Sequence, residues 1–581
     1  MATRRKLSSL VVIAALACSL CVYAAPRDKD DKSEIKFTAR AELVLIPTLV
    51  TDKSGNHITG LKKEDFTVLE NGAEQKIATF EEITSDAQRW IRPKNPNEFG
   101  NTLTGGQSAR RVTLIVLDFI NTGFAAQAYA RKDLLKYLTE TVDQREPTAL
   151  YTLTRSGVQV IHDFTTDPRI LAAALHKVKG DAYEMVDSPE EVEAITGTAS
   201  PDGSAGIDPG TASGGGNPKG SGGSAASVAA EAQKIQTMME DSELNFQSFQ
   251  QRLAITYTLE AMQQIAQALA GFPGRKSLIW ASGGFPFSVS DTTMQLAPAG
   301  RDSLVDVLPM YEHTWQLLND AEISLYPVDV KGLQTLMPSA SLSNPGKNYN
   351  RNMSWRQIDT QSTLQTFASM TGGRAYYNSN DLVKGFRDAV HDSGEYYVLG
   401  YYLDRSKTKS GWRKLAVKVK RDHIEVRARN GFFVTNATTD PEITRNNDIL
   451  SALQSPLDYT SIALAAHWDK IEAGKDPTKK HVNYEMHLAP DASLIDDSDN
   501  NHLAIELVTV AKTSEGKQVE NPTDKKIEVH LPAEKMPSIR QSGVSFRGSL
   551  DLAPGEYTVR FVVRDNLSGR IGSVAAPLRV E

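Results

Sequence analysis

The sequence contains only two cysteines, Cys18 and Cys21, and both lie near the N-terminus. A small scaffold held together by disulfides is therefore excluded. No second long apolar run follows the N-terminal one, which excludes a membrane protein with several helical spans. The formal charge of −7 provides no broad positive surface, so we expect no nucleic-acid partner.

The N-terminus has the pattern of a secretion signal. Arg4, Arg5 and Lys6 form a basic head, and an apolar stretch over 10–20 follows them. Small residues then precede a cleavage site that we place after Ala24, with no transmembrane segment left after cleavage. Removal of residues 1–24 would change the formal charge from −7 to −10 and leave a chain without cysteine. The protein is therefore expected to be exported to the periplasm, the cell envelope or the medium.

Two other interpretations of this segment remain open. The apolar stretch could stay uncleaved as an anchor. Alternatively, Ala15-Leu16-Ala17-Cys18 loosely resembles a lipobox, which would place a lipid on Cys18. Alanine is a poor residue at the first lipobox position, so this pattern favours the cleaved signal peptide.

The composition is that of an ordinary globular chain, with 40% hydrophobic and 23% charged residues. At roughly 150 residues per domain, its 581 residues predict about three or four domains. Composition and periodicity divide the chain into a signal peptide (1–24), a small β module (36–85), an α/β domain (110–435) with a disordered Gly/Ser-rich insertion (about 181–250), and an Ig-like β-sandwich (459–581).

Strand and helix patterns alternate over 111–392. The run that ends in Leu117-Asp118 is continuously apolar, as expected for a strand buried on both faces of a parallel sheet. The predicted fold class is therefore α/β: a doubly wound, mostly parallel sheet of the Rossmann type. We expect a small N-terminal β module and a C-terminal β-sandwich to flank it. A β-hairpin after residue 395 is placed against the α/β domain.

Several segments in the same order and spacing resemble a known family. They are Val44–Asp52, Gly60-Leu61 with Glu64-Asp65-Phe66, Leu117-Asp118 with Asn121-Thr122, Tyr129-Ala130-Arg131, Ile279–Pro286, Tyr326–Asp329, Thr371–Ala375 and Tyr397–Tyr402. Together they resemble the von Willebrand factor type A (VWA) domain, and more closely the acidobacterial-type VWFA-related exported proteins. The resemblance covers about 40–435 and leaves the C-terminal sandwich out. It implies a VWA-like sheet and a non-catalytic binding or adhesion protein.

The same resemblance implies a metal-ion-dependent adhesion site at the carboxyl edge of the sheet. VWA domains hold Mg²⁺ or a similar cation there with an Asp-x-Ser-x-Ser loop and residues from two later loops. Here the loop has Asp118, Asn121 and Thr122 as candidate ligands, while Ile120 replaces the first serine. The later loop at 281–284 lacks the expected carboxylate. The site is thus degenerate, and the alternative is that Asp118 and Asn121 cap the following helix.

The sequence matches the motifs of known enzyme classes less well than it matches a binding domain. A haloacid-dehalogenase-like phosphatase needs a second aspartate at the position of Ile120. Ser282 follows a strand as a hydrolase nucleophile would, but Trp280 occupies the place of the first glycine of the Gly-x-Ser-x-Gly motif. No catalytic residue and no certain cofactor is assigned. A hydrolase of unknown substrate remains one alternative, and an envelope assembly scaffold is another.

The expected partner is a protein or a cell-surface glycan. A basic cluster lies in the predicted hairpin and could meet an anionic glycan or lipid, although lysines at alternate strand positions are more often a solvated face. The cluster contains Arg405, Lys407, Lys409, Arg413, Lys414, Lys418, Lys420 and Arg421.

Overall fold

The computed structural model describes residues 41–83, 97–101, 112–140, 147–178, 225–285, 288–290, 293–295, 307–332, 361–391, 395–404, 408–434, 441–491, 494–496, 499–519 and 522–581. The predicted signal peptide and the glycine-rich part of the insertion lie outside these residues. Helix α5 (Ala225–Leu269) begins within the last part of the predicted insertion. No helix in the described ranges combines the length and apolarity needed to cross a membrane.

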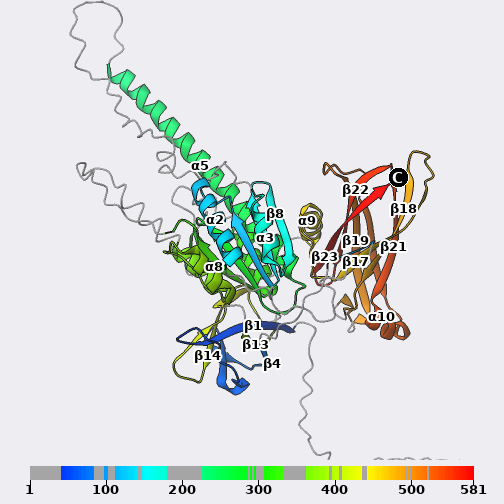
Figure 1. Cartoon of the computed structure of the whole chain (residues 1–581), viewed down its shortest axis with the longest axis horizontal. Coiled ribbons are helices and arrows are strands. Elements are labelled where there is room, and N and C mark those ends of the chain that lie inside the picture. Colours follow the sequence, from blue (N-terminus) through cyan, green and yellow to red (C-terminus); the bar gives the residue numbers. More distant parts are fainter. Residues whose placement is uncertain are drawn as a thin grey trace, which may run out of the picture. The chain divides into compact units, whose positions relative to one another are not determined.

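One five-stranded sheet contains the parallel strands (Figure 1). Its spatial order is β12 (Ile323–Asp329), β9 (Lys276–Ser282), β6 (Val112–Asp118), β7 (Thr148–Thr154) and β8 (Gly157–Thr165). The first four are parallel, and β8 runs antiparallel to β7. Every residue of β6, β9 and β12 is buried, which agrees with the apolar residues at the centre of each strand.

Helices cover both faces of this sheet. Ile115 and Leu117 of β6 pack with α2 (Phe124–Glu140), α3 (Pro168–Leu175) and α8 (Leu382–His391). Leu114 and Val116 point to the other face and pack with α5 and α6 (Leu308–Asp320). The start of α3 follows from its local sequence, since Pro168 is its first residue and the Asp167 side chain accepts a hydrogen bond from Arg169 N.

Two further sheets are built from both ends of the 41–434 region. One contains β15 (Ile424–Arg427), β1 (Ala41–Asp52), β13 (Tyr396–Asp404) and β4 (Thr79–Ile83). The other contains β16 (Gly431–Val434), β14 (Gly411–Val419), β2 (Phe66–Glu70) and β3 (Ala73–Gln75). The Asn71-Gly72 pair is typical of a tight hairpin turn, and it joins β2 to β3 with φ of 48° and 85°. The strands after residue 395 therefore pair with the N-terminal strands.

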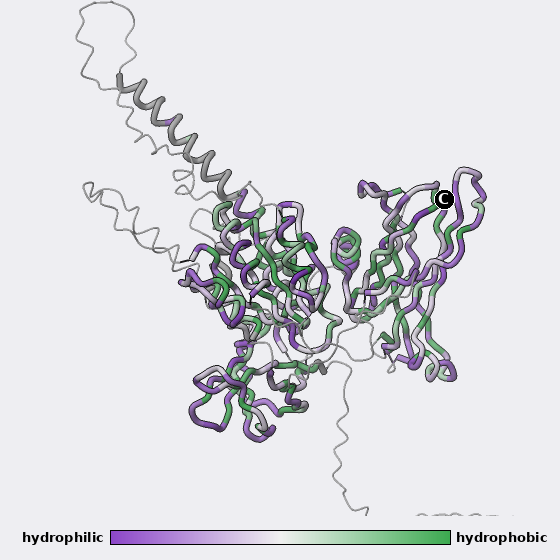
Figure 2. The backbone as a smooth tube through the Cα atoms, in the orientation of Figure 1, coloured by the Kyte–Doolittle hydropathy of each residue, from purple (hydrophilic) through white to green (hydrophobic). Residues whose placement is uncertain are grey.

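The C-terminal region has two four-stranded sheets with a shared apolar core. One contains β21 (Val544–Leu552), β18 (Lys480–Leu488), β17 (Leu464–Ala473) and β5 (Glu98–Gly100). The other contains β20 (Thr523–His530), β19 (His502–Thr513), β22 (Gly555–Asp565) and β23 (Ile571–Val580). Met486 and Phe561 lie in the core between them. Figure 2 shows hydrophobic residues alternating with hydrophilic ones along these strands.

The described chain also contains a helix whose described part spans 361–371, and several other elements. The other elements are η1 (Lys63–Asp65), β10 (Ser288–Ser290), β11 (Thr293–Gln295), α9 (Pro441–Gln454), η5 (Ala533–Lys535) and α10 (Met536–Ser542).

The prediction of a doubly wound, mostly parallel α/β fold class is wrong. Strands make up 44% of the structure and helices 29%. Of the sheets formed by described residues, five are small and mostly antiparallel, and a single one contains parallel strands. The fold is a mixed α/β structure in which antiparallel pairing dominates. The cause is long-range pairing, such as that of β14 with β2, which periodicity within one segment does not reveal.

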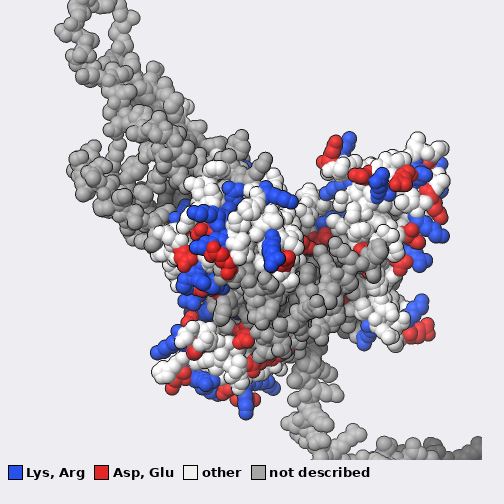
Figure 3. Space-filling view, viewed as in Figure 1, with Lys and Arg blue, Asp and Glu red and all other residues white. Residues whose placement is uncertain are grey.

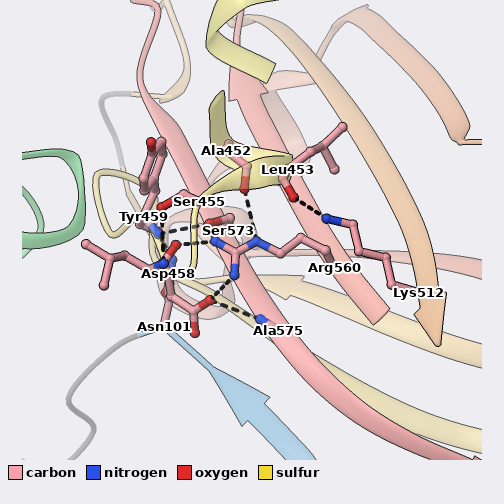
Figure 4. A network of polar contacts seen from close by, with 11 residues as sticks. Asn101, Ala452, Leu453, Ser455, Asp458, Tyr459, Lys512, Arg560, Ser573 and Ala575 are labelled. Carbon is pink, nitrogen blue, oxygen red and sulfur yellow. Dashed lines mark hydrogen bonds and ion pairs between the residues drawn. The ribbon is translucent and has the colours of Figure 1, made fainter. Parts of the chain in front are cut away.

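Cationic side chains hold the C-terminal end of α9 against the sheet that contains β22. Arg560 Nε donates to the carbonyl of Ala452 at 3.0 Å, and Lys512 Nζ donates to the carbonyl of Leu453 at 2.9 Å (Figure 4). These carbonyls lie at the negative end of the helix dipole, where positive charge is favourable. Two ion pairs add to this attachment: Arg445 with Glu506, and Arg564 with Asp448.

A lysine is buried at the opposite end of the parallel sheet from Asp118. Lys276 begins β9 and is 2% exposed. Burial lowers its pKa to about 8, and attraction to Glu322 opposes the change only in part. The unfolded chain therefore holds one more proton than the folded chain between about pH 8 and the ordinary lysine pKa of about 10.4. Below pH 8 the buried charge costs about 3 kcal/mol.

Replacement of Lys276 with methionine is accordingly expected to stabilise the chain by up to about 3 kcal/mol at pH 7. The advantage should shrink as the pH rises from about 8 toward 10.4, because the folded wild type has then already lost its proton. Urea unfolding of both proteins across this pH range measures the difference. Lys136→Met, at an exposed site on α2, is the control and should show no such trend. A constant difference between Lys276→Met and the wild type would contradict the explanation.

Candidate functional site

Three parallel strands end in polar residues at one edge of the sheet. Asp118 ends β6, Ser282 ends β9 and Asp329 ends β12. The register places Asp329 directly beside Ser282. The carboxyl edge of an open α/β sheet is where ligands usually bind, so this edge is the candidate site that the sequence predicted.

Asp118 is the centre of a hydrogen-bond network at this edge. Its Oδ1 accepts from the backbone N–H groups of Ile120 and Asn121, each at 3.0 Å. Its Oδ2 accepts from Asn121 Nδ2 at 2.8 Å, Trp280 Nε1 at 3.0 Å and Ser282 Oγ at 2.8 Å. The residue is 1% exposed. Both carboxyl oxygens are therefore occupied by donors of this chain.

Burial raises the pKa of Asp118 above its ordinary value, and the hydrogen bonds from Asn121, Ser282 and Trp280 oppose the rise. A buried carboxylate is tolerated only when it is well hydrogen-bonded. The network thus stabilises the charged form and joins the ends of β6 and β9.

The other two candidate ligands lie beside Asp118 and are also engaged. Asn121 Nδ2 donates to Thr258 Oγ1 at 2.9 Å as well as to Asp118, while its Oδ1 is buried without a hydrogen-bond partner. Thr122 Oγ1 accepts from Gly283 N at 2.8 Å. A Cβ at Gly283 would lie 2.9 Å from the carbonyl oxygen of Asn121, so a glycine is needed where the two loops meet. The structure brings the predicted residues together as partners of one another.

These residues do not fit a magnesium ion. An ion at Asp118 would have to displace donors from both carboxyl oxygens. Asn121 Oδ1 is one unpaired acceptor, and a single neutral oxygen is too weak a ligand for a strongly hydrated cation. Among the described residues, no group of three or more histidine, cysteine, aspartate or glutamate side chains is arranged around a metal position.

The structure also bears on the other interpretations of these residues, namely a helix cap, a hydrolase nucleophile and a phosphatase aspartate. Asp118 binds amides at positions 120 and 121, whereas α2 begins at Phe124, so Asp118 orders the loop and does not cap the helix. Ser282 is fully buried, donates to Asp118 and accepts from Gly284 N at 3.1 Å. The side chain at the position of the second phosphatase aspartate is the buried Ile120.

A cleft of about 390 Å³ opens beside the end of β12. Asp329 is one of its lining residues and is 9% exposed. Burial raises the pKa of Asp329, and a hydrogen bond from Lys331 N lowers it in part. The cleft is lined by Val328, Asp329, Arg374, Ala375, Tyr376, Tyr377, Ser379, Asp381, Leu382, Lys384, Gly385 and Asp388.

Sequence analysis missed most of these lining residues, because they come from one irregular segment and one helix face. The signal that could have found them is the pair Gly372-Gly373 just before the segment. Gly372 has φ of +77°, and a Cβ at Gly373 would lie 1.9 Å from the carbonyl oxygen of Leu325. Such a close approach presses the following residues against the end of the sheet.

The predicted basic cluster is only partly described, since Arg405 and Lys407 lie outside the described residues. Within the described part, Arg413 forms a buried ion pair with Glu70, and Tyr401 donates to Glu70 Oε2 at 3.0 Å. The lysines at 414, 418 and 420 are exposed. The arrangement of these lysines agrees with a solvated face of β14.

In comparisons with known proteins, no family model and no curated protein matches the chain.

Proposed function

We propose that the chain is an exported, non-catalytic binding protein that holds a protein or glycan partner in the cleft beside β12. The observation that carries the proposal is the contrast at the carboxyl edge of the sheet. Asp118 and Ser282 are buried and hydrogen-bonded to each other, while the neighbouring cleft presents polar side chains to solvent. The resemblance to VWA-type exported proteins supports the same type of function.

The wall of the cleft is held in place by backbone contacts. Tyr376 N donates to the carbonyl of Pro327 at 2.8 Å, and Asp329 N donates to the carbonyl of Tyr376 at 2.8 Å. Tyr129 of α2 fixes the far side by donating to the carbonyl of Asn380 at 3.0 Å. A preformed cleft loses little conformational entropy on binding, which favours recognition.

The side chains of the cleft suit a neutral or mixed-charge partner. Arg374 is exposed, and Lys384 is paired with Asp388. Tyr376 and Tyr377 add aromatic surface with hydroxyl groups, which can contact both sugars and peptides. Basic and acidic side chains of the described residues are interspersed on the face that Figure 3 shows.

The test is a binding screen of the mature chain against a glycan array and immobilised envelope proteins, repeated with the cleft variant Arg374→Glu/Tyr377→Ala. Binding should weaken by about tenfold or more in this variant. Arg387→Glu is the matched control, because Arg387 is exposed on α8 but does not line the cleft. Equal binding by both variants would overturn the cleft as the site. Turnover on a hydrolase panel that Ser282→Ala abolishes would overturn the non-catalytic assignment.

A further inference from the structure

Strand β20 forms a long open edge of the C-terminal pair of sheets. It has eight residues, pairs with β19 without a register shift, and is the last described strand of its sheet on that side. Edge strands are usually kept short, or interrupted by a proline or a bulge, so that they do not pair with another chain. Ile527 packs partly against the core between the sheets, and Val529, on the same face of the strand, is 42% exposed. Strand β20 therefore presents backbone groups and apolar side chains together at its open side.

A hydrogen bond just after β20 shows which backbone groups of this strand point outward. Leu531 N donates to the carbonyl of Asn501 at 3.0 Å, and these two residues are the next pair in the register of β19 with β20. Along an antiparallel pair, bonded and non-bonded residues alternate. The odd-numbered residues of β20 therefore bond to β19, and the N–H and C=O groups of the even-numbered residues point to the open side. These even-numbered residues are Asp524, Lys526, Glu528 and His530.

The charges on these outward residues favour one way for β20 to pair with a second copy of itself. Opposite residues of an antiparallel pair are bonded or non-bonded together, so a two-fold axis has to pass beside one residue of the strand. An axis at Ile527 places Lys526 opposite Glu528 of the second copy, and Glu528 opposite Lys526. Opposite charges in such cross-strand pairs are stabilising.

The neighbouring registers are less favourable. An axis at Lys526 places the two lysines opposite each other and Asp524 opposite Glu528, so that like charges meet throughout. An axis at Lys525 pairs Asp524 with Lys526 but leaves Glu528 beyond the start of the partner strand. The axis at Ile527 thus combines the longest overlap with opposite charges and brings the two Ile527 side chains together.

We propose that two copies of the chain associate through β20, in an antiparallel pair with the two-fold axis at Ile527. The pairing joins two four-stranded sheets into one continuous sheet. Backbone hydrogen bonds at the even-numbered residues supply affinity, and the pairs of Lys526 with Glu528 fix the register. On the other face of the strand, Val529 is covered by the aliphatic part of Lys525 from the second copy. No residue of β20 lines the cleft beside β12, so this association is independent of the proposed function.

The test is sedimentation velocity of the mature chain over a range of concentrations, in which the wild type should form a dimer. Lys526→Glu and Glu528→Lys should each weaken the dimer by about tenfold or more, because each places like charges opposite each other. An equimolar mixture of these two variants should dimerise again, since every cross-strand pair between them has opposite charges. Lys470→Glu is the matched control: Lys470 is exposed on β17, an inner strand of the other sheet, and its charge reversal should leave the dimer unchanged.

Hydrogen exchange of the wild type tests the register without any substitution. The outward amides of Lys526 and Glu528 should exchange more slowly as the protein concentration rises, whereas the amide of Ile527, which already bonds to β19, should change little. The proposal is overturned if the wild type stays a monomer at every concentration, as it would if this edge bound only an extended segment of another protein. It is also overturned if both single variants still dimerise, or if their mixture associates no better than either variant alone.

Discussion

Replacement of Asp118 with alanine is expected to lower the free energy of unfolding by about 3–5 kcal/mol, because several buried donors each lose about 1–3 kcal/mol when unpaired. The change removes the acceptor for donors on three other side chains and two backbone amides, all of them in or next to the buried edge of the sheet. Donors that are left unpaired in a buried site lose their hydration without compensation. Urea unfolding measures the loss, and the fluorescence of Trp280, which donates to Asp118, should report it directly.

Asp381→Ala is the control for this substitution. Asp381 is exposed and accepts only at the start of α8, from Lys384 N at 2.9 Å, so its loss should cost about 1 kcal/mol. Magnesium distinguishes the two roles of Asp118. If the residue were an ion ligand, Mg²⁺ would raise the unfolding temperature of the wild type and not that of Asp118→Ala. That result would contradict the conclusion that the main role of Asp118 is to accept hydrogen bonds at the edge of the sheet.

The position of Asp118 could be predicted from the sequence, but its partners could not. A continuous apolar run that ends in a carboxylate predicts a buried strand end, and β6 has this form. Trp280 and Ser282 come from β9, more than 160 residues later, and local patterns do not align one strand with another. The sequence did indicate that such partners exist, because polar residues end the otherwise apolar strands and buried polar groups need hydrogen-bond partners.

Local structure was the predictable part of the fold. The Asn71-Gly72 turn and the Asp167 cap follow from the chemistry of a few adjacent residues. The direction of β8 was also available from the sequence. Only Arg155 and Ser156 separate Thr154 from Gly157, and a parallel connection needs a dozen residues or more. Strands β7 and β8 therefore had to form an antiparallel hairpin.

Pairing between distant segments was the unpredictable part. Strand β2 joins β14 across more than 340 residues, and the three-residue strand β5 joins β17. Asn101, just after β5, secures that pairing by donating to the carbonyl of Tyr459 at 2.6 Å and accepting from Leu464 N at 2.9 Å. A three-residue strand has too little periodicity to be recognised, and its stability comes from contacts made only in the folded chain.

Arg560→Ala is the second substitution with a large expected effect, also about 3–5 kcal/mol in the free energy of unfolding. Arg560 is 5% exposed, and its guanidinium binds the carbonyls of Ala452 and Leu457, Ser573 Oγ at 3.0 Å, and Asp458 Oδ1 at 2.9 Å (Figure 4). Removal of this group leaves several buried acceptors unpaired at once. Helix α9 should detach from β22 first, since the carbonyl of Ala452 near its C-terminal end loses the donor on β22.

Urea unfolding and hydrogen exchange of α9 separate this effect from a general loss of stability. Arg560→Lys should be intermediate, because one ammonium group cannot reach all four acceptors of the planar guanidinium. Arg570→Ala is the control: its half-buried side chain pairs with Asp491 at 2.9 Å, and its loss should cost less than about 1 kcal/mol. If Arg560→Ala left exchange in α9 unchanged, the helix would have to be held by its apolar contacts through Ile449 and Ala452. The cations would then only neutralise the carboxylates around them.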